Sequence, residues 1–135
     1  MVTATINNVY SDDDGPILKI DREFVANEAA DPTLPMVNFN NIAITDSISD
    51  NGQGGAFWLD LDTIMSTMTT MSFTNIESRQ DGGVIYLHTA TSLIMSGISA
   101  YNFKTTHGEG SFIHLDTASN TNPFTLSLTL GSFSC

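Results

Sequence analysis

The stretch that decides the fold is "DGGVIYLHTATSLIMSG", residues 81–97, because two relatives of it occur elsewhere in the chain. The first is "GQGGAFWLDLDTIMST" at residues 52–67, and the second is "GEGSFIHLDTASNTNPF" at residues 108–124. In each of these stretches, a glycine is followed by a run in which every second residue is apolar. Alternation with a period of two indicates β-strands and argues against long amphipathic helices.

The glycines that open these runs are evenly spaced. Gly54, Gly82 and Gly110 recur every 28 residues, and a weaker copy, "GPILKID", starts at Gly15. One unit of this length cannot bury its own apolar face, so the units are expected to stack on one another. Three short strands per unit, stacked about 4.8 Å apart, would give a parallel β-helix.

The alternation also assigns the core of such a stack. In each glycine-anchored strand the first and third apolar positions should point inward, and equivalent positions should pile up in columns. The inward residues predicted in this way are Leu18, Ile20, Phe57, Leu59, Leu61, Ile85, Leu87, Ile113 and Leu115.

A second motif lies upstream of each glycine: "INNV", "FNNI", "FTNI" and "AYNF". Its asparagines would fall at one corner of successive units, where stacked amides can hydrogen-bond along the axis. Asparagine also favours turns on its own account, which is the competing explanation. The residues of this predicted ladder are Asn8, Asn41, Asn75 and Asn102.

With motifs of the kinds F-x-N-I and G-G-x-I-Y-L, the chain resembles right-handed parallel β-helix proteins, such as pectate-lyase-like enzymes, autotransporter passengers and other repeat-rich surface proteins. The resemblance runs from Ile6 onward. It implies an all-β, right-handed parallel β-helix solenoid of about four coils with open ends, in one domain over residues 1–135. Residues 21–36 and 43–53 are expected to be loop excursions. A β-sandwich is the main competitor, but it would not explain the even glycine spacing.

Composition narrows the classes of function. The chain has 15 acidic and 4 basic residues, with a net charge of -11, which argues against binding to nucleic acid or to an anionic membrane. No apolar stretch approaches the length of about 20 residues that spans a bilayer. An acidic, lightly charged, Ser/Thr/Asn-rich chain is typical of extracellular or cell-surface proteins. Cys135 is the one cysteine, so no internal disulfide is expected; it could be reactive, pair with another chain or mark a cut in a longer one.

Outward positions of the glycine-anchored strands form the first candidate site. One column is expected to hold Lys19, Trp58, Tyr86 and His114, about 5 Å apart. Trp and Tyr rings stack on sugars and are enriched in protein interfaces, so the column could be a carbohydrate platform or a contact with another subunit. Ordinary outward residues chosen for β propensity are the alternative.

The next outward column is expected to hold Asp21, Asp60, His88 and Asp116, with His88 between two carboxylates. A flat column diverges, so it does not predict a metal site. Asp60 and Asp116 are two units apart, which is compatible with the separation of about 6.5–9.5 Å between the carboxylates of an inverting glycosidase. The chain lacks the basic groups of pectate lyases, a nucleophile motif and a phosphate loop. We therefore expect no catalytic residue, no metal and no cofactor.

The densest acidic cluster, "SDDDG", contains Asp12, Asp13 and Asp14. It lacks the spaced ligands of a calcium loop, so a solvated acidic turn is favoured over a weak calcium site.

The ends of the chain suggest a role. "VTATINNV" starts almost at once as a strand, and "LGSFSC" stops with Phe133 in the inward register, so neither end shows a cap. Open edges template association, and head-to-tail stacking that does not close gives filaments. The sequence predicts a non-catalytic extracellular structural module that stacks end to end with its own copies or forms part of a larger surface solenoid. The alternative is a carbohydrate-binding or carbohydrate-cleaving β-helix that uses the column of Trp58 and Tyr86 together with the acidic column of Asp60 and Asp116.

Overall fold

The computed structural model describes residues 4–20, 37–60, 65–89, 92–116, 124–129 and 131–134. This part of the chain is all-β, as predicted, and contains no helix. Accordingly, it contains no helix long and apolar enough to cross a membrane. The expected excursion at residues 21–36, Leu61 and Cys135 lie outside the described residues.

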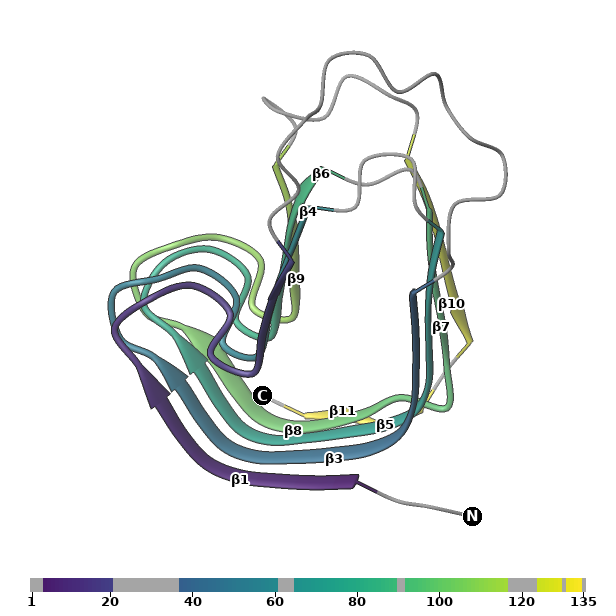
Figure 1. Cartoon of the computed structure of the whole chain (residues 1–135), viewed down its shortest axis with the longest axis horizontal. Helices are drawn as coiled ribbons and strands as arrows, with labels where there is room; N and C mark the ends of the chain where they lie inside the picture. The colour runs from purple at the N-terminus through teal and green to yellow at the C-terminus, as the bar shows by residue number, and fades with distance from the viewer. Residues whose placement is uncertain are drawn as a thin grey trace.

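The strands form two parallel sheets (Figure 1). Sheet A contains β1 (Ala4–Ser11), β3 (Val37–Ser49), β5 (Met65–Ser78), β7 (Ser92–Ser96), β8 (Ser99–Thr105), β10 (Thr125–Thr129) and β11 (Phe133–Ser134). Sheet B contains β2 (Leu18–Ile20), β4 (Phe57–Asp60), β6 (Ile85–Thr89) and β9 (Ile113–Leu115).

Strands far apart in the sequence lie side by side in regular order. Sheet A follows the order β1-β3-β5-β7-β10, and β8 pairs with β5 and β11. The first part of the long strand β5 pairs with β7 and its second part with β8. Sheet B follows the order β2-β4-β6-β9. In Figure 1 sheet A bends around the interior, and the strands of sheet B stand across from β7 and β10.

The predicted columns of sheet B are confirmed. Leu59 is paired with Leu87, and Leu87 with Leu115, so these three residues lie one above another. The neighbouring column contains Leu18, Phe57, Ile85 and Ile113. Phe57, Leu59, Ile85 and Leu87 are buried, because a strand of the same pattern lies on each side of them.

Sheet A contributes columns of the same kind to the other side of the core. Ile44 and Phe73 are paired and almost fully buried, and Met68 and Met95 form a second buried pair. Aromatic contacts connect the two sheets, since the Phe57 ring lies 5.2 Å from that of Phe39 and 6.0 Å from that of Phe73. One continuous apolar core therefore holds both sheets together.

The expected loop at residues 43–53 is only partly correct. Strand β3 continues without interruption from Val37 to Ser49, so the turn begins at Asp50. The reason lies in the paired positions: Ile44 and Ser47 are buried, which makes "AITDSIS" a core strand despite its polar residues. Bends within β3 and β5, rather than loops, carry the chain around the core (Figure 1).

Candidate functional site

The outer column of sheet B has the predicted order. Lys19 is paired with Trp58, Trp58 with Tyr86, and Tyr86 with His114. The rings stack: Trp58 and Tyr86 have centroids 6.2 Å apart, and Tyr86 and His114 have centroids 5.3 Å apart with planes within 3°. The Lys19 ammonium lies 4.9 Å from the centre of the Trp58 ring, which is within cation–π range.

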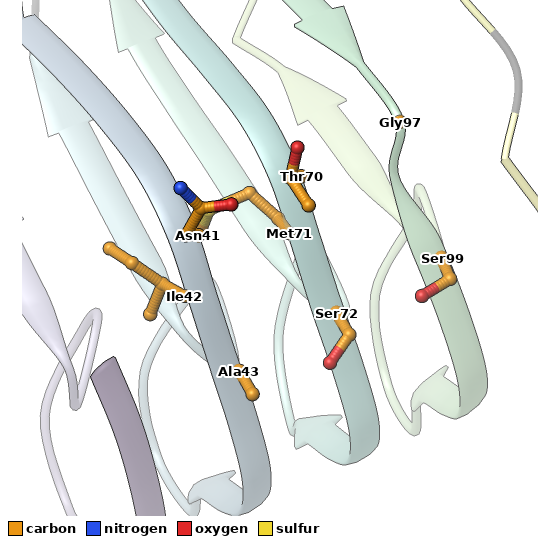
Figure 2. A pocket seen from close by; sticks show the side chains of 8 residues that line it. All are labelled: Asn41, Ile42, Ala43, Thr70, Met71, Ser72, Gly97 and Ser99. Atoms are coloured by element: carbon orange, nitrogen blue, oxygen red, sulfur yellow. The ribbon is translucent and has the colours of Figure 1, made fainter. Parts of the chain in front are cut away.

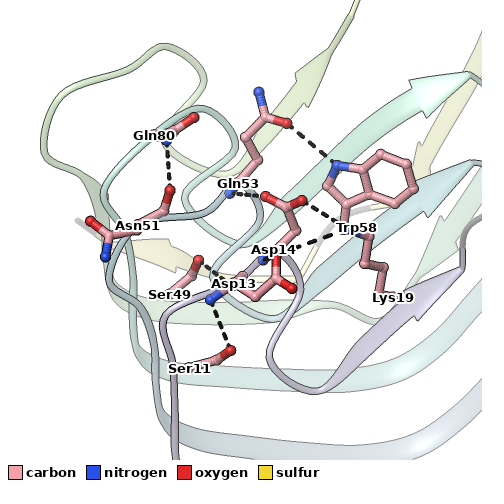
Figure 3. Close-up of polar contacts among 9 residues, drawn as sticks. All are labelled: Ser11, Asp13, Asp14, Lys19, Ser49, Asn51, Gln53, Trp58 and Gln80. Carbon is pink, nitrogen blue, oxygen red and sulfur yellow. Dashed lines mark hydrogen bonds and ion pairs between the residues drawn. The ribbon is translucent and has the colours of Figure 1, made fainter.

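This aromatic column is not the open platform that we expected. Trp58 is only 8 % exposed and Tyr86 only 4 % exposed. The turns that precede the strands of sheet B fold back against the column, as Figure 3 shows for Gln53, whose side-chain oxygen accepts a hydrogen bond from the Trp58 indole at 3.4 Å. The expected flat, exposed surface at Trp58 and Tyr86 is therefore not seen, and carbohydrate binding there stays a prediction.

Glycine makes this close approach possible. Gly15 and Gly54 adopt φ of +50° and +68°, in the left-handed region that glycine enters without strain. A Cβ atom on Gly15 would lie 2.5 Å from the backbone nitrogen of Trp58, and one on Gly54 would lie 2.0 Å from the Phe57 carbonyl oxygen. The regular glycines of the sequence thus let each turn close over the aromatic column.

Burial also controls the chemistry of Tyr86. Desolvation raises the pKa of Tyr86 to about 12, and the neighbouring Asp116 carboxylate adds to the rise. The phenol therefore stays neutral up to strongly alkaline pH, so it is not prepared to act as a base near neutrality.

The acidic and histidine column is only partly formed. His88 and Asp116 make an ion pair, with His88 Nδ1 3.3 Å from Asp116 Oδ2. Asp60 is paired with Thr89 rather than with His88, because the register shifts between Leu59 and Asp60. The expected register of this column is therefore not kept at Asp60, and the ion pair of His88 with Asp116 is the part of the arrangement that is seen. Asp21 lies outside the described residues.

The His88 ring lies against the aromatic column. Its centroid is 5.3 Å from that of Trp58 and 6.5 Å from that of Tyr86, and both pairs are stacked. His88 thus stacks on the aromatic column and also pairs with Asp116. The described residues contain no group of three or more His, Cys, Asp or Glu side chains that could hold a metal ion.

The acidic cluster of the first turn is bound into the fold. Asp14 accepts a hydrogen bond from the Gln53 amide at 2.8 Å and pairs with the Lys19 ammonium at 3.0 Å (Figure 3). Tyr10 donates to the carboxylates of Asp12 and Asp50, at 3.1 and 2.9 Å, and the bond to Asp50 is the main reason that its pKa rises to about 12. These contacts connect one turn with the next.

The asparagine ladder exists with one member changed. Asn8, Asn75 and Asn102 lie at equivalent bends with φ of 55°, 55° and 51°, and the Asn102 amide donates to the Asn75 side-chain oxygen at 2.8 Å. The residue between Asn8 and Asn75 is Asp46, which accepts a hydrogen bond from the Asn75 amide at 2.7 Å.

Asn41 therefore does not belong to that ladder, and its predicted place there is wrong. It stands at an earlier bend, level with Thr70 and Gly97, and all three have positive φ. The letters "FNNI" resemble "FTNI", but the strand that aligns with "FTNI" is "ITDS" at residues 44–47. Asn and Asp tolerate the left-handed conformation equally well, so the sequence motif concealed the structural equivalence.

A column of hydroxyl side chains was missed by the sequence reasoning. The Ser49 hydroxyl donates to the Asp13 carbonyl at 2.9 Å, the Ser78 hydroxyl to the Gly52 carbonyl at 2.9 Å, and the Thr105 hydroxyl to the Gln80 carbonyl at 2.7 Å. Each bond ties a strand to the turn of its neighbour. The signal in the sequence was a Ser or Thr four or five positions before each anchoring glycine.

Comparisons with known proteins do not assign the chain to a family. No protein-family model matches the chain, and no curated protein or solved structure matches it.

Proposed function

We propose that this protein is a non-catalytic structural module, a right-handed parallel β-helix of about four coils that extends by strand pairing at its ends. It would stack end to end with copies of itself or serve as a section of a larger extracellular or cell-surface solenoid. The support is the pairing of equivalent residues at every step, as in the column of Leu59, Leu87 and Leu115. The right hand is favoured because parallel crossover connections nearly always take it.

The observation that carries the proposal is the exposure of the final strands. Leu126 and Leu128 of β10 are 45 % and 42 % exposed, and Phe133 of β11 is 37 % exposed. Their column partners Leu93, Met95 and Ala100 on the preceding strands are buried. No described strand pairs with the outer side of β10 or β11, so an edge with apolar side chains is open to another strand.

The opposite edge offers a matching surface. β1 and β2 each pair on one side only among the described strands, and Ile6, Val9 and Leu18 are half-buried there. If a second copy continues the register, Ile6 of that copy would follow Phe133 in its column, and Leu18 would follow Ile113. Apolar residues would then meet apolar residues, and free backbone groups would be paired.

An extracellular location is part of the same proposal. A net charge of -11 with only 4 basic residues disfavours nucleic acid and anionic membranes as partners. The buried position of Tyr86 and the hydrogen bond that Asp14 accepts from the Gln53 backbone favour structural over catalytic roles.

The test is the assembly state of the purified chain, measured by sedimentation velocity and negative-stain microscopy over a range of protein concentrations. The wild type should form rods that lengthen with concentration. The double variant Leu126→Lys/Leu128→Lys should remain short, because charges on an edge strand oppose pairing. Ile94→Lys is the matched control: Ile94 lies on β7, paired with Ser127 of β10, and points outward.

Wild-type particles that stay monomeric at every concentration would refute end-to-end stacking by this chain. Equal shortening by Ile94→Lys would show that added charge, and not the edge, controls assembly.

A further inference from the structure

The outer surface of one part of sheet A differs in chemistry from the rest of the molecule. We name it the hydroxyl face: the outward positions of β1, β3, β5, β8 and the segment ending in β11, between the two bends. Paired positions place its side chains in two columns. One column contains Thr5, Ala43, Ser72, Ser99 and Ser132, and the other contains Asn7, Thr45, Thr74, Tyr101 and Ser134.

The hydroxyl face carries no charged side chain, although the chain as a whole has a net charge of -11. Its hydroxyl groups are also available. Within the described part of the chain, the side chains of Ser72, Thr74 and Ser99 have no hydrogen-bond partner, in contrast to the buried Ser78. Each is partly exposed to solvent, so they can bond to a ligand without breaking an internal contact.

Two shallow grooves of about 250 Å³ each cross this face. The first is next to the bend at Asn41, Thr70 and Gly97, and Figure 2 shows the side chains of Ser72 and Ser99 projecting in the same direction from adjacent strands. The second lies beside Tyr101 and Ser134. Ser99 lines both grooves, so the two grooves lie next to each other on this face.

Tyr101 supplies an open aromatic ring beside the second groove. It is 61 % exposed, whereas Trp58 and Tyr86, the rings that the sequence suggested for a ligand, are buried. An aromatic ring that presents an apolar body and a polar tip to solvent is suited to stacking on a partly apolar ligand.

We propose that the hydroxyl face binds a neutral oligosaccharide that lies across the strands. Neutral sugars present hydroxyl groups that exchange hydrogen bonds with Ser, Thr and Asn side chains, and apolar ring faces that stack on tyrosine. Neighbouring strands are about 4.8 Å apart, which is close to the length of one pyranose unit, so successive sugars would meet successive strands. An acidic polysaccharide is disfavoured, since the face has no cation and the net charge is -11.

The experiment is isothermal titration calorimetry of the full chain with hexasaccharides of β-1,4-linked glucose and β-1,4-linked N-acetylglucosamine. Hexagalacturonate serves as the anionic comparison. At least one neutral hexasaccharide should bind. Tyr101→Ala should raise the dissociation constant for that hexasaccharide about tenfold. Ser72→Glu, which places a charge in the first groove, should also weaken binding.

Tyr10→Ala is the matched control, because Tyr10 is 62 % exposed but lies outside the hydroxyl face, next to Asp12 and Asp50. It should leave the dissociation constant unchanged, and sugar binding should not alter the fluorescence of Trp58, the single tryptophan. Circular dichroism would verify that each variant is folded.

Several results would overturn the proposal: no binding of either neutral hexasaccharide, equal binding of hexagalacturonate, or full affinity in a folded Tyr101→Ala variant. A change in Trp58 fluorescence when the sugar binds would indicate that the sugar binds at the aromatic column and not at the hydroxyl face. Binding of a protein to the hydroxyl face, when no sugar binds there, would likewise refute the proposal. Because all variants retain Leu126 and Leu128, failure here would leave the assembly test unaffected.

Discussion

The middle strands and the final strands of the molecule use the same residue pattern with different results. Leu93 in β7 is fully buried, yet its paired neighbour Leu126 in β10 is 45 % exposed. Phe73 in β5 is 1 % exposed, whereas Phe133 of β11, two strands further in the same column, is 37 % exposed. Burial in this fold therefore depends on having a strand on both sides, and not on the side chain alone.

Side-chain truncation should expose this difference most strongly. Leu87→Ala should lower the free energy of unfolding by about 3–5 kcal/mol, because Leu87 is fully buried between Leu59 and Leu115 and its removal leaves a cavity. Leu128→Ala should cost about 1 kcal/mol or less, since Leu128 is already 42 % exposed. Urea unfolding at a concentration where the chain is monomeric measures both.

Equal losses in the two variants would contradict the comparison. A large loss in Leu128→Ala that appears only at high protein concentration would instead show that assembly buries the final strand.

The pH dependence of stability should reveal the buried phenol of the middle strands. The folded-state pKa of Tyr86 is about 12, above its ordinary value of 10.0. The unfolded chain therefore loses the Tyr86 proton first, so the contribution is complete below pH 10 and is lost as pH rises towards 12. The expected loss is on the order of 1–2 kcal/mol.

Chemical unfolding at intervals of pH, wild type against Tyr86→Phe, measures this term by difference. The variant should show a shallower decline between pH 10 and pH 12. Parallel declines would mean that Tyr86 ionises as readily in the folded state as in the unfolded chain.

The column of Ser49, Ser78 and Thr105, whose hydroxyl groups bond to neighbouring turns, should also show that a middle strand is more sensitive to substitution than a strand nearer the end. Ser78 is buried and donates to the Gly52 carbonyl, so Ser78→Ala should cost about 1–2 kcal/mol by leaving that carbonyl without its donor. Thr105→Val removes a similar bond to the Gln80 carbonyl from a more exposed strand, where water can replace it. The expected cost of Thr105→Val is below about 0.5 kcal/mol. The shift of the urea midpoint measures both variants. A larger cost for Thr105→Val than for Ser78→Ala would contradict the dependence on strand position.

Sequence reasoning succeeded where a repeat in letters is also a repeat in space. Gly54, Gly82 and Gly110 share one spacing, and the strands behind them pair without a shift as far as Leu59. It failed where spacing varies: the offset between β1 and β3 differs from that between β3 and β5, so Asn41 was aligned in place of Asp46.

The candidate site was harder to predict than the fold. Alternation correctly gave Trp58 and Tyr86 as outward residues of sheet B. Alternation describes only the two faces of a strand, however, and cannot show that a preceding turn folds back to cover one of them. The positive φ of Gly15 and Gly54, which closes that turn, is a tertiary property that a spacing of glycines only suggests.

One bend of a middle strand carries a residue that is poorly suited to its backbone conformation, so a substitution there should stabilise the fold. Thr70 has φ of 54°, a conformation that β-branched residues rarely adopt, while its column neighbours are Asn41 and Gly97, which tolerate it. Thr70→Asn should therefore raise the free energy of unfolding by about 0.5–1 kcal/mol. Thr69→Asn, one residue earlier in β5 and paired with Asn40, makes the same chemical change in ordinary strand geometry and should give no gain. A gain in both variants, measured by urea unfolding, would attribute the effect to the asparagine side chain rather than to relief of backbone strain.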